Sequence, residues 1–114
     1  MAADIDPFAI AAIGLNAKAN HVRIETTRDD LLNAEPRDVD VILAGDCWYE
    51  ERFALRMSAW LERAAAAGIH VLIGDPGRRY LAHDRLTALA TYDVRSTTDL
   101  EDLGRTRATV YELA

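Results

Sequence analysis

Residues 39–50 read VDVILAGDCWYE, an apolar strand pattern followed directly by a carboxylate and two aromatic rings. Val39–Ala44 is a nearly unbroken apolar run, which is typical of a parallel strand covered on both faces. Glu50–Ala67 follows as the clearest helix of the chain, because its apolar residues share one stripe and Gly68 can end it. Ile69–Ile73 is a second apolar strand. This order predicts two parallel strands joined by a right-handed crossover.

The segments on either side predict further elements. Asp6-Pro7 begins a helix that Phe8–Ala19 continues, because Asp accepts hydrogen bonds from free N–H groups and Pro fits the first helical position. Val22–Thr27 alternates apolar and polar residues, which predicts a strand near a sheet edge. We expect a loop over Asp29–Arg37. The remaining predicted elements are a short helix around Asp84–Ala90 and an antiparallel pair of strands, Tyr92–Thr97 and Thr106–Leu113, separated by a polar loop that contains Gly104.

The order of these elements predicts an α/β fold in a single domain of residues 1–114. Strands that alternate with helices form a three-layer sandwich, and ligands gather beyond the carboxyl ends of its strands. The length of 114 residues and the apolar content of 50% suffice for one modest core.

Composition excludes several classes of function. The 13 Lys and Arg against 19 Asp and Glu give a net charge of −6, which argues against a nucleic-acid-binding surface. With Cys47 as its one cysteine the chain forms no intramolecular disulfide, and no Cys/His spacing predicts a metal site. No apolar run approaches the roughly 20 residues that span a membrane, and the N-terminus lacks a signal-peptide pattern. We therefore expect a cytoplasmic protein with no membrane partner.

Acidic residues stand where four predicted strands end: Asp4, Asp30, Asp46 and Asp75. A carboxylate at the carboxyl edge of a sheet can accept hydrogen bonds from ribose hydroxyls or from an exocyclic adenine amine. The alternative for each residue is a simple cap of a helix or turn. Four such positions together favour a ligand site.

The segment Asp46–Tyr49 carries the densest chemistry. Asp46 can orient or deprotonate an attacking amine, and the rings of Trp48 and Tyr49 can border a cation. The alternative for both rings is packing beneath the following helix. Cys47 is expected to be a small buried filler, because no His lies nearby in sequence to activate it.

With these segments placed, the chain resembles the C-terminal two-thirds of a class I S-adenosylmethionine-dependent methyltransferase. The likeness is strongest to the group of lysine methyltransferases of the electron-transfer-flavoprotein β subunit, whose bacterial relatives are described as nicotinamide N-methyltransferase-like. The residues that carry the resemblance are Ala2–Ala9, Asn16-Ala17, Asp30–Leu32, Leu43–Glu50 and Val71–Arg78. Gly-Asp-x-x-Tyr followed at this distance by Ile-Gly-Asp-Pro-Gly-Arg is the most specific part.

The resemblance implies S-adenosylmethionine as cofactor and assigns residues to it. Asp4 would hold the ribose hydroxyls, with Ile5 against the adenine. Asp30 would receive the adenine amino group.

On the acceptor side, the resemblance implies that Asp46 and Tyr49 form the catalytic acid-x-x-aromatic signature. Arg78 and the turn before it would line the substrate side. For Trp48, its aromatic ring beside Asp46 predicts a contact with the substrate, independently of the resemblance. The implied reaction is in-line attack of a neutral amine on the sulfonium methyl group, with a protein lysine as the expected acceptor. A small pyridine-type amine is the alternative acceptor.

The chain departs from the family in one respect. The family's first strand and its Gly-rich turn would precede Asp4, where only Met1-Ala2-Ala3 stand. We therefore expect the seven-strand methyltransferase sheet without its first strand and most of its second. The unpaired inner edges suggest a strand-swapped dimer or a partner chain. They also leave open a non-catalytic, partner-dependent module.

Overall fold

The computed structural model describes residues 1–95 and 105–114. The chain forms two compact units, a first unit of Met1–Glu35 and a second unit of Pro36–Ala114. Each unit is described by itself. Across the described ranges, no helix has both the length and the apolar character needed to cross a membrane.

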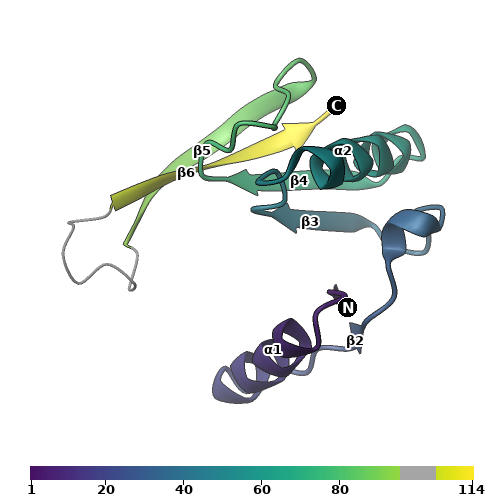
Figure 1. The fold of residues 1–114 in the computed structure, drawn as a ribbon, viewed down its shortest axis with the longest axis vertical. Helices are drawn as coiled ribbons and strands as arrows, with labels where there is room; N and C mark the ends of the chain where they lie inside the picture. The colour runs from purple at the N-terminus through teal and green to yellow at the C-terminus, as the bar shows by residue number, and fades with distance from the viewer. Residues whose placement is uncertain (96–104) are drawn as a thin grey trace. The chain divides into compact units, whose positions relative to one another are not determined.

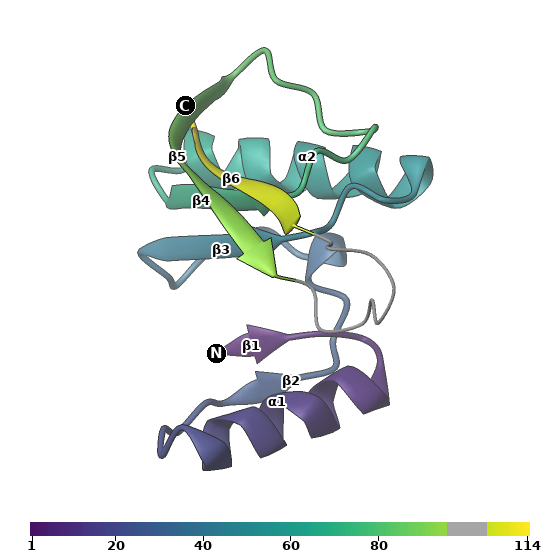
Figure 2. The same cartoon turned by 90° about the vertical axis from the view of Figure 1, so that its left-hand side faces the viewer.

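The first unit is a small strand–helix–strand motif. Strands β1 (Ala2–Ala3) and β2 (Thr26–Thr27) pair in parallel, and helix α1 (Pro7–Ala19) connects them. Figure 2 shows the two strands side by side with α1 along them. As predicted, Asp6 caps α1, because its Oδ1 accepts a hydrogen bond from the N–H of Phe8 at 2.9 Å.

Two details of the first unit differ from the sequence prediction. The strand expected over Val22–Thr27 shrinks to β2, because β1 offers only two residues for pairing. The loop expected over Asp29–Arg37 contains a short 3-10 helix, η1 (Leu31–Asn33). Asp30 caps this helix through a hydrogen bond of 3.1 Å from the N–H of Leu32 to Oδ1.

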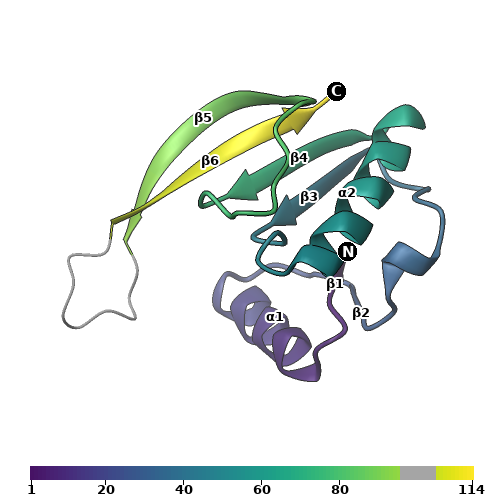
Figure 3. The ribbon, with the colours of Figure 1, turned by 45° about the horizontal axis from the view of Figure 1, so that its top comes forward.

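The second unit is a four-stranded mixed sheet with a helix against it (Figures 1 and 3). Its strands lie in the order β3-β4-β6-β5, where β3 and β4 are parallel and the other neighbours are antiparallel. Helix α2 crosses over from β3 to β4 and packs against β4 and β6. The bounds are β3 (Val41–Gly45), α2 (Glu51–Ala66), β4 (His70–Asp75), β5 (Leu86–Arg95) and β6 (Arg105–Leu113). The α/β class and the C-terminal antiparallel pair are confirmed.

The core of the second unit lies between α2 and the sheet. The predicted stripe of α2 buries Trp60, Leu61 and Ala64, and Gly68 ends the helix with a φ of +85°. Such a φ is strained for residues with a Cβ, which explains glycine at this position. The buried apolar side chains of this unit are Ala44, Trp48, Ala54, Trp60, Leu61, Ala64, Ile69, Val71, Ile73 and Leu81.

The prediction that β3 is covered on both faces was wrong. Ala44 is buried, whereas Val41 is half exposed and Leu43 is 77% exposed. Within the second unit, the described residues supply a helix for one face of the sheet only. Alternate side chains of β3 therefore remain uncovered, because successive residues of a strand point to opposite faces.

The predicted helix around Asp84–Ala90 was also wrong, because this segment begins strand β5. Leu and Ala favour a helix locally, but β6 offers a long antiparallel edge whose ladder satisfies the backbone of β5. The pairing continues past an irregularity between Ala88 and Ala90, and the hydroxyls of Thr91 and Thr109 lie 3.0 Å apart across the ladder. Ser96, Thr97 and the loop expected at Gly104 lie outside the described residues.

Candidate functional site

Two acidic residues of the second unit lie at the same edge of the sheet. Asp46 directly follows β3, and Asp75 is the last residue of the neighbouring parallel strand β4. The backbone N–H of Asp46 donates a hydrogen bond of 2.9 Å to the carbonyl of Gly74. This edge is formed by the carboxyl ends of parallel strands, where α/β proteins bind ligands.

Arg78 binds the carboxylate of Asp46 through two parallel hydrogen bonds. Its Nε lies 2.6 Å from Oδ1 and its Nη2 lies 2.9 Å from Oδ2. The hydrogen bonds and the charge of Arg78 hold the pKa of Asp46 below its ordinary value, and Asp46 in turn raises the pKa of Arg78. Both side chains are about half exposed, so solvent reaches this pair.

The ion pair with Arg78 bears on the two roles predicted for Asp46, which are to orient an attacking amine or to deprotonate it. It favours the first. A carboxylate that is held ionised is a weak base, so deprotonation of an amine is disfavoured. Its oxygens have about four lone-pair sites in total, of which Arg78 uses two. Asp46 can therefore still accept a hydrogen bond and orient a donor. Its φ of +51° is a left-handed conformation that Asp tolerates better than most residues.

Asp75 stabilises the turn that carries Arg78. Its side chain is buried, and its Oδ2 accepts hydrogen bonds of 2.7 Å from the backbone N–H groups of both Gly77 and Arg78. Pro76 followed by Gly77, which has a φ of +93°, is the residue pattern of a type II turn. This is the turn cap that the sequence analysis gave as the alternative for Asp75, and the Pro-Gly pair after it is the pattern of that turn.

The two aromatic rings after Asp46 have different environments. Trp48 is 0% exposed and its Nε1 donates a hydrogen bond of 3.0 Å to Oγ of Ser58 on α2. This burial favours the packing alternative for Trp48 and argues against the role of substrate contact. Tyr49 is 63% exposed, and its ring centroid lies 6.0 Å from that of Phe53. Cys47 is half-buried, which is less burial than the prediction of a small buried filler implied.

The predicted cofactor residues lie together in the first unit. Asp4 directly follows β1, and Asp30 follows the parallel strand β2, so both stand beyond carboxyl ends. The N–H of Asp4 donates to the carbonyl of Thr27 at 3.2 Å, and its Oδ1 accepts from the N–H of Asp6 at 2.9 Å. Asp30 caps η1, and Ile5 is exposed. Capping and ligand binding are compatible here, because one carboxylate can accept several hydrogen bonds.

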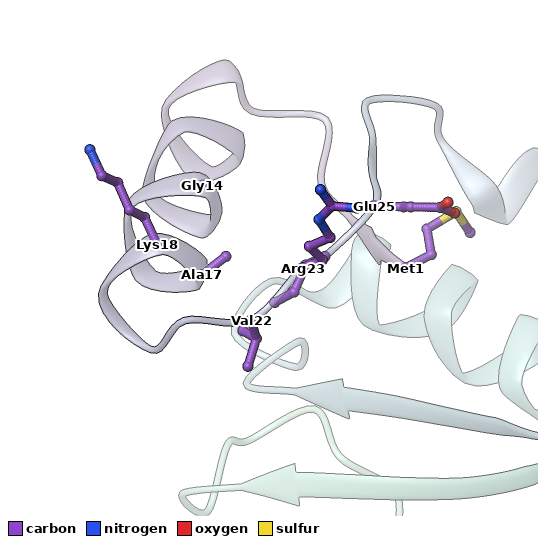
Figure 4. A pocket seen from close by; sticks show the side chains of 8 residues that line it. Met1, Gly14, Ala17, Lys18, Val22, Arg23 and Glu25 are labelled. Atoms are coloured by element: carbon purple, nitrogen blue, oxygen red, sulfur yellow. The ribbon is translucent and has the colours of Figure 1, made fainter.

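A hollow of about 840 Å³ in the first unit lies at the opposite end of its strands (Figure 4). Met1 precedes β1 and Glu25 precedes β2, so the hollow is at the amino ends, away from Asp4 and Asp30. It is lined by Met1, Gly14, Ala17, Lys18, Val22, Arg23, Ile24 and Glu25. We therefore do not assign the cofactor to it. Nor does any group of three or more His, Cys, Asp or Glu among the described residues form a possible metal site.

Comparison with known proteins points to one family. No family model matches the chain. The electron transfer flavoprotein beta subunit lysine methyltransferase of Rattus norvegicus is 35% identical over 98% of this chain, and that of Homo sapiens is 33% identical over 97%. The crystal structure of the N-methyltransferase NodS from Bradyrhizobium japonicum matches 97% of this chain and 70% of its own, with a TM-score of 0.58 and 14% identity. The chain is thus similar in sequence to lysine methyltransferases and in fold to an N-methyltransferase over almost its whole length.

The alignments with these methyltransferases cover almost the whole of this chain but only part of each relative. The chain spans about half the length of the curated methyltransferases that it matches, 46% of the Rattus norvegicus protein and 48% of the Xenopus laevis protein. The match to NodS confirms the methyltransferase fold. In each unit taken by itself, the acids stand beyond the carboxyl ends of parallel strands.

Proposed function

We propose that this chain contributes to an S-adenosylmethionine-dependent N-methyltransferase whose acceptor is a protein lysine side chain. The observation that carries the proposal is Asp46, held ionised by Arg78 at a carboxyl edge, with the exposed ring of Tyr49 three residues on. The names of the curated relatives support lysine as the acceptor.

For the cofactor, the donors and acceptors of the first unit fit the chemistry. Carboxylates that stand beyond parallel strands, as Asp4 and Asp30 do, accept hydrogen bonds from ribose hydroxyls and from the adenine amino group. Ile5 is an exposed apolar side chain beside Asp4, suited to contact with the adenine ring. When bound, S-adenosylmethionine supplies a methyl group on a sulfonium centre.

For the acceptor, the residues of the second unit suit an amine. Tyr49 offers an exposed aromatic ring, which attracts the ammonium form of a lysine. Asp46 then accepts a hydrogen bond from the amine and fixes the direction of the nitrogen lone pair. Because Asp46 is too weak a base to remove the proton, we propose that the proton leaves to solvent before transfer.

The test separates the cofactor side from the acceptor side. Transfer of labelled methyl groups and binding of S-adenosylmethionine by equilibrium dialysis are measured for the protein with Asp46→Asn, Asp4→Asn or Asp84→Asn. Asp84 is exposed and serves as a matched control. We expect Asp46→Asn to lose transfer and keep cofactor affinity, Asp4→Asn to lose affinity, and Asp84→Asn to keep both. The proposal fails if the unaltered protein neither binds the cofactor nor transfers methyl groups.

The same assay, run with different candidate methyl acceptors, decides the substrate class. Lysine-containing proteins and small pyridine-type amines are offered side by side. Transfer to the small amines alone would replace the lysine proposal by the small-molecule alternative.

A second candidate is a non-catalytic module that depends on a partner strand. Strand β3 lies at one end of the strand order of its sheet, and its Val41 and Leu43 are exposed. Edges of this kind invite strand addition from another chain or from a second copy. Sedimentation of the 114-residue chain tests this candidate. A cofactor-free monomer at all concentrations would refute the swapped dimer, and concentration-dependent association would support it.

A further inference from the structure

Burial of the Asp75 side chain is energetically unfavourable. Its side chain is 2% exposed, and its Oδ1 is buried with no hydrogen-bond partner among the described residues. A buried carboxylate with one unsatisfied oxygen loses free energy relative to an apolar side chain of similar size. Buried polar atoms normally have hydrogen-bond partners, and exceptions occur mostly at functional sites. The burial of Asp75 therefore calls for a role beyond filling space.

The contacts of its other oxygen show what Asp75 does. Oδ2 accepts the N–H groups of Gly77 and Arg78, each at 2.7 Å, and so fixes the backbone from which the Arg78 side chain extends. The Nε and Nη2 groups of Arg78 then donate hydrogen bonds to Asp46, which lies 32 positions earlier in the chain. The three residues form one series: a buried anchor, a cation on the anchored turn, and a carboxylate at the neighbouring strand end.

We propose that Asp75 is a positioning residue that acts through Arg78 on Asp46. The anchored turn presents the guanidinium in the one plane that meets both oxygens of Asp46, which a freely rotating arginine on a loose turn would rarely hold. Arg78 is then a clamp on Asp46 rather than a contact of the substrate. The catalytic meaning of this arrangement rests on the proposed function, whereas the clamp itself does not.

The clamp has a direct readout in the titration of Asp46. The groups that act on this carboxyl are the guanidinium of Arg78, which lowers its pKa, and burial, which raises it. Asp75 adds to the field at Arg78 and supports its charge. Loss of the clamp at any point therefore moves the pKa of Asp46 up, toward its ordinary value of 3.8.

The experiment follows the side-chain carboxyl of Asp46 by carbon-13 NMR as the pH of the 114-residue chain is lowered. Asp75→Ala removes the acceptor for both N–H groups, and Arg78→Gln removes the cation directly. Both are expected to raise the pKa of Asp46. Asp75→Asn keeps an oxygen at the Oδ2 position and is expected to restore the low pKa. Arg79→Gln serves as the matched control, because the guanidinium of Arg79 lies 5.6 Å from the ring of Tyr80 and is not among the groups that shift the pKa of Asp46.

Each outcome bears on the proposal. If Arg78→Gln raises the pKa of Asp46 and a folded Asp75→Ala does not, Asp75 does not act through Arg78 and the proposal is overturned. If Asp75→Ala fails to fold, hydrogen exchange of the unaltered chain decides: protected amides at Gly77 and Arg78 support the anchor, and unprotected ones refute it. No cofactor or acceptor is present in either measurement. The proposed function can therefore fail independently of this proposal. If the titration shows the clamp but the protein transfers no methyl groups, the proposed function is refuted and the role of Asp75 stands.

Discussion

Replacing Ser58 with alanine leaves the indole N–H of Trp48 buried without its acceptor. The ring of Trp48 is 0% exposed, and its Nε1 lies 3.0 Å from Oγ of Ser58. An unsatisfied buried donor costs about 1–3 kcal/mol. Ser58 lies inside α2, where alanine is the better helix former by about 0.5 kcal/mol. We therefore expect Ser58→Ala to lower the free energy of unfolding by about 0.5–2.5 kcal/mol.

A double-mutant cycle with Trp48→Phe isolates the hydrogen bond from these other effects. Phenylalanine has no N–H, so no donor is left unsatisfied when Ser58 is also replaced. The helix-propensity gain is common to both backgrounds and cancels in the cycle. In the Trp48→Phe background, the cost of Ser58→Ala should vanish or change sign.

The cycle is measured by urea unfolding, followed by far-ultraviolet circular dichroism so that loss of the Trp48 fluorescence does not matter. Equal costs of Ser58→Ala in both backgrounds would refute the contact between the two side chains. The same series tests the place of Trp48 in the core. If Trp48→Phe left stability unchanged and altered only acceptor KM, Trp48 would be a substrate contact and the packing role would be wrong.

Three further predictions concern the turn, the ion pair and the first helix. Gly77→Ala should lower stability by about 1 kcal/mol through backbone strain alone, because Gly77 has a φ of +93° and an added Cβ meets nothing within 4 Å; urea unfolding measures this, and an unchanged midpoint would contradict it. The Asp46–Arg78 pair should stabilise the fold above pH 3.8 and lose its effect as the pH falls through the lower folded-state pKa. Arg78→Gln should remove that acid-side slope, and parallel slopes for the two proteins would exclude the pair as its cause. Asp6→Ala should raise hydrogen exchange at the start of α1, since a lost cap costs about 1 kcal/mol; unchanged exchange there would show that the cap is dispensable.

Local chemistry made several parts of this protein predictable. The capped start of α1 follows from Asp6-Pro7, and the end of α2 follows from Gly68, because both depend on residues within one turn. The parallel pairing of β3 and β4 was predictable because two apolar strands joined by a helix form a right-handed crossover. The acids at the strand ends were likewise visible as a pattern.

Long-range pairing decided the parts that the sequence predicted wrongly. Residues Leu86–Ala90 favour a helix when read alone, yet the edge of β6 draws them into β5. The length of β2 depends on β1, which offers two residues for pairing. Covering one face of β3 and not the other depends on where α2 packs, which no pattern within the strand reveals.

The sequence by itself determined the α/β class, the caps and stops of the helices, and the set of acids that includes Asp46 and Asp75, because each depends on neighbours along the chain. Only the tertiary structure decided how those residues are used. It buried Trp48 against Ser58, exposed Tyr49, and joined Asp75 through Arg78 to Asp46. The contact of Trp48 with Ser58 joins residues 10 positions apart, and the contact of Arg78 with Asp46 joins residues 32 positions apart. Such contacts are set by how β3, α2 and β4 pack and pair, and not by any single segment.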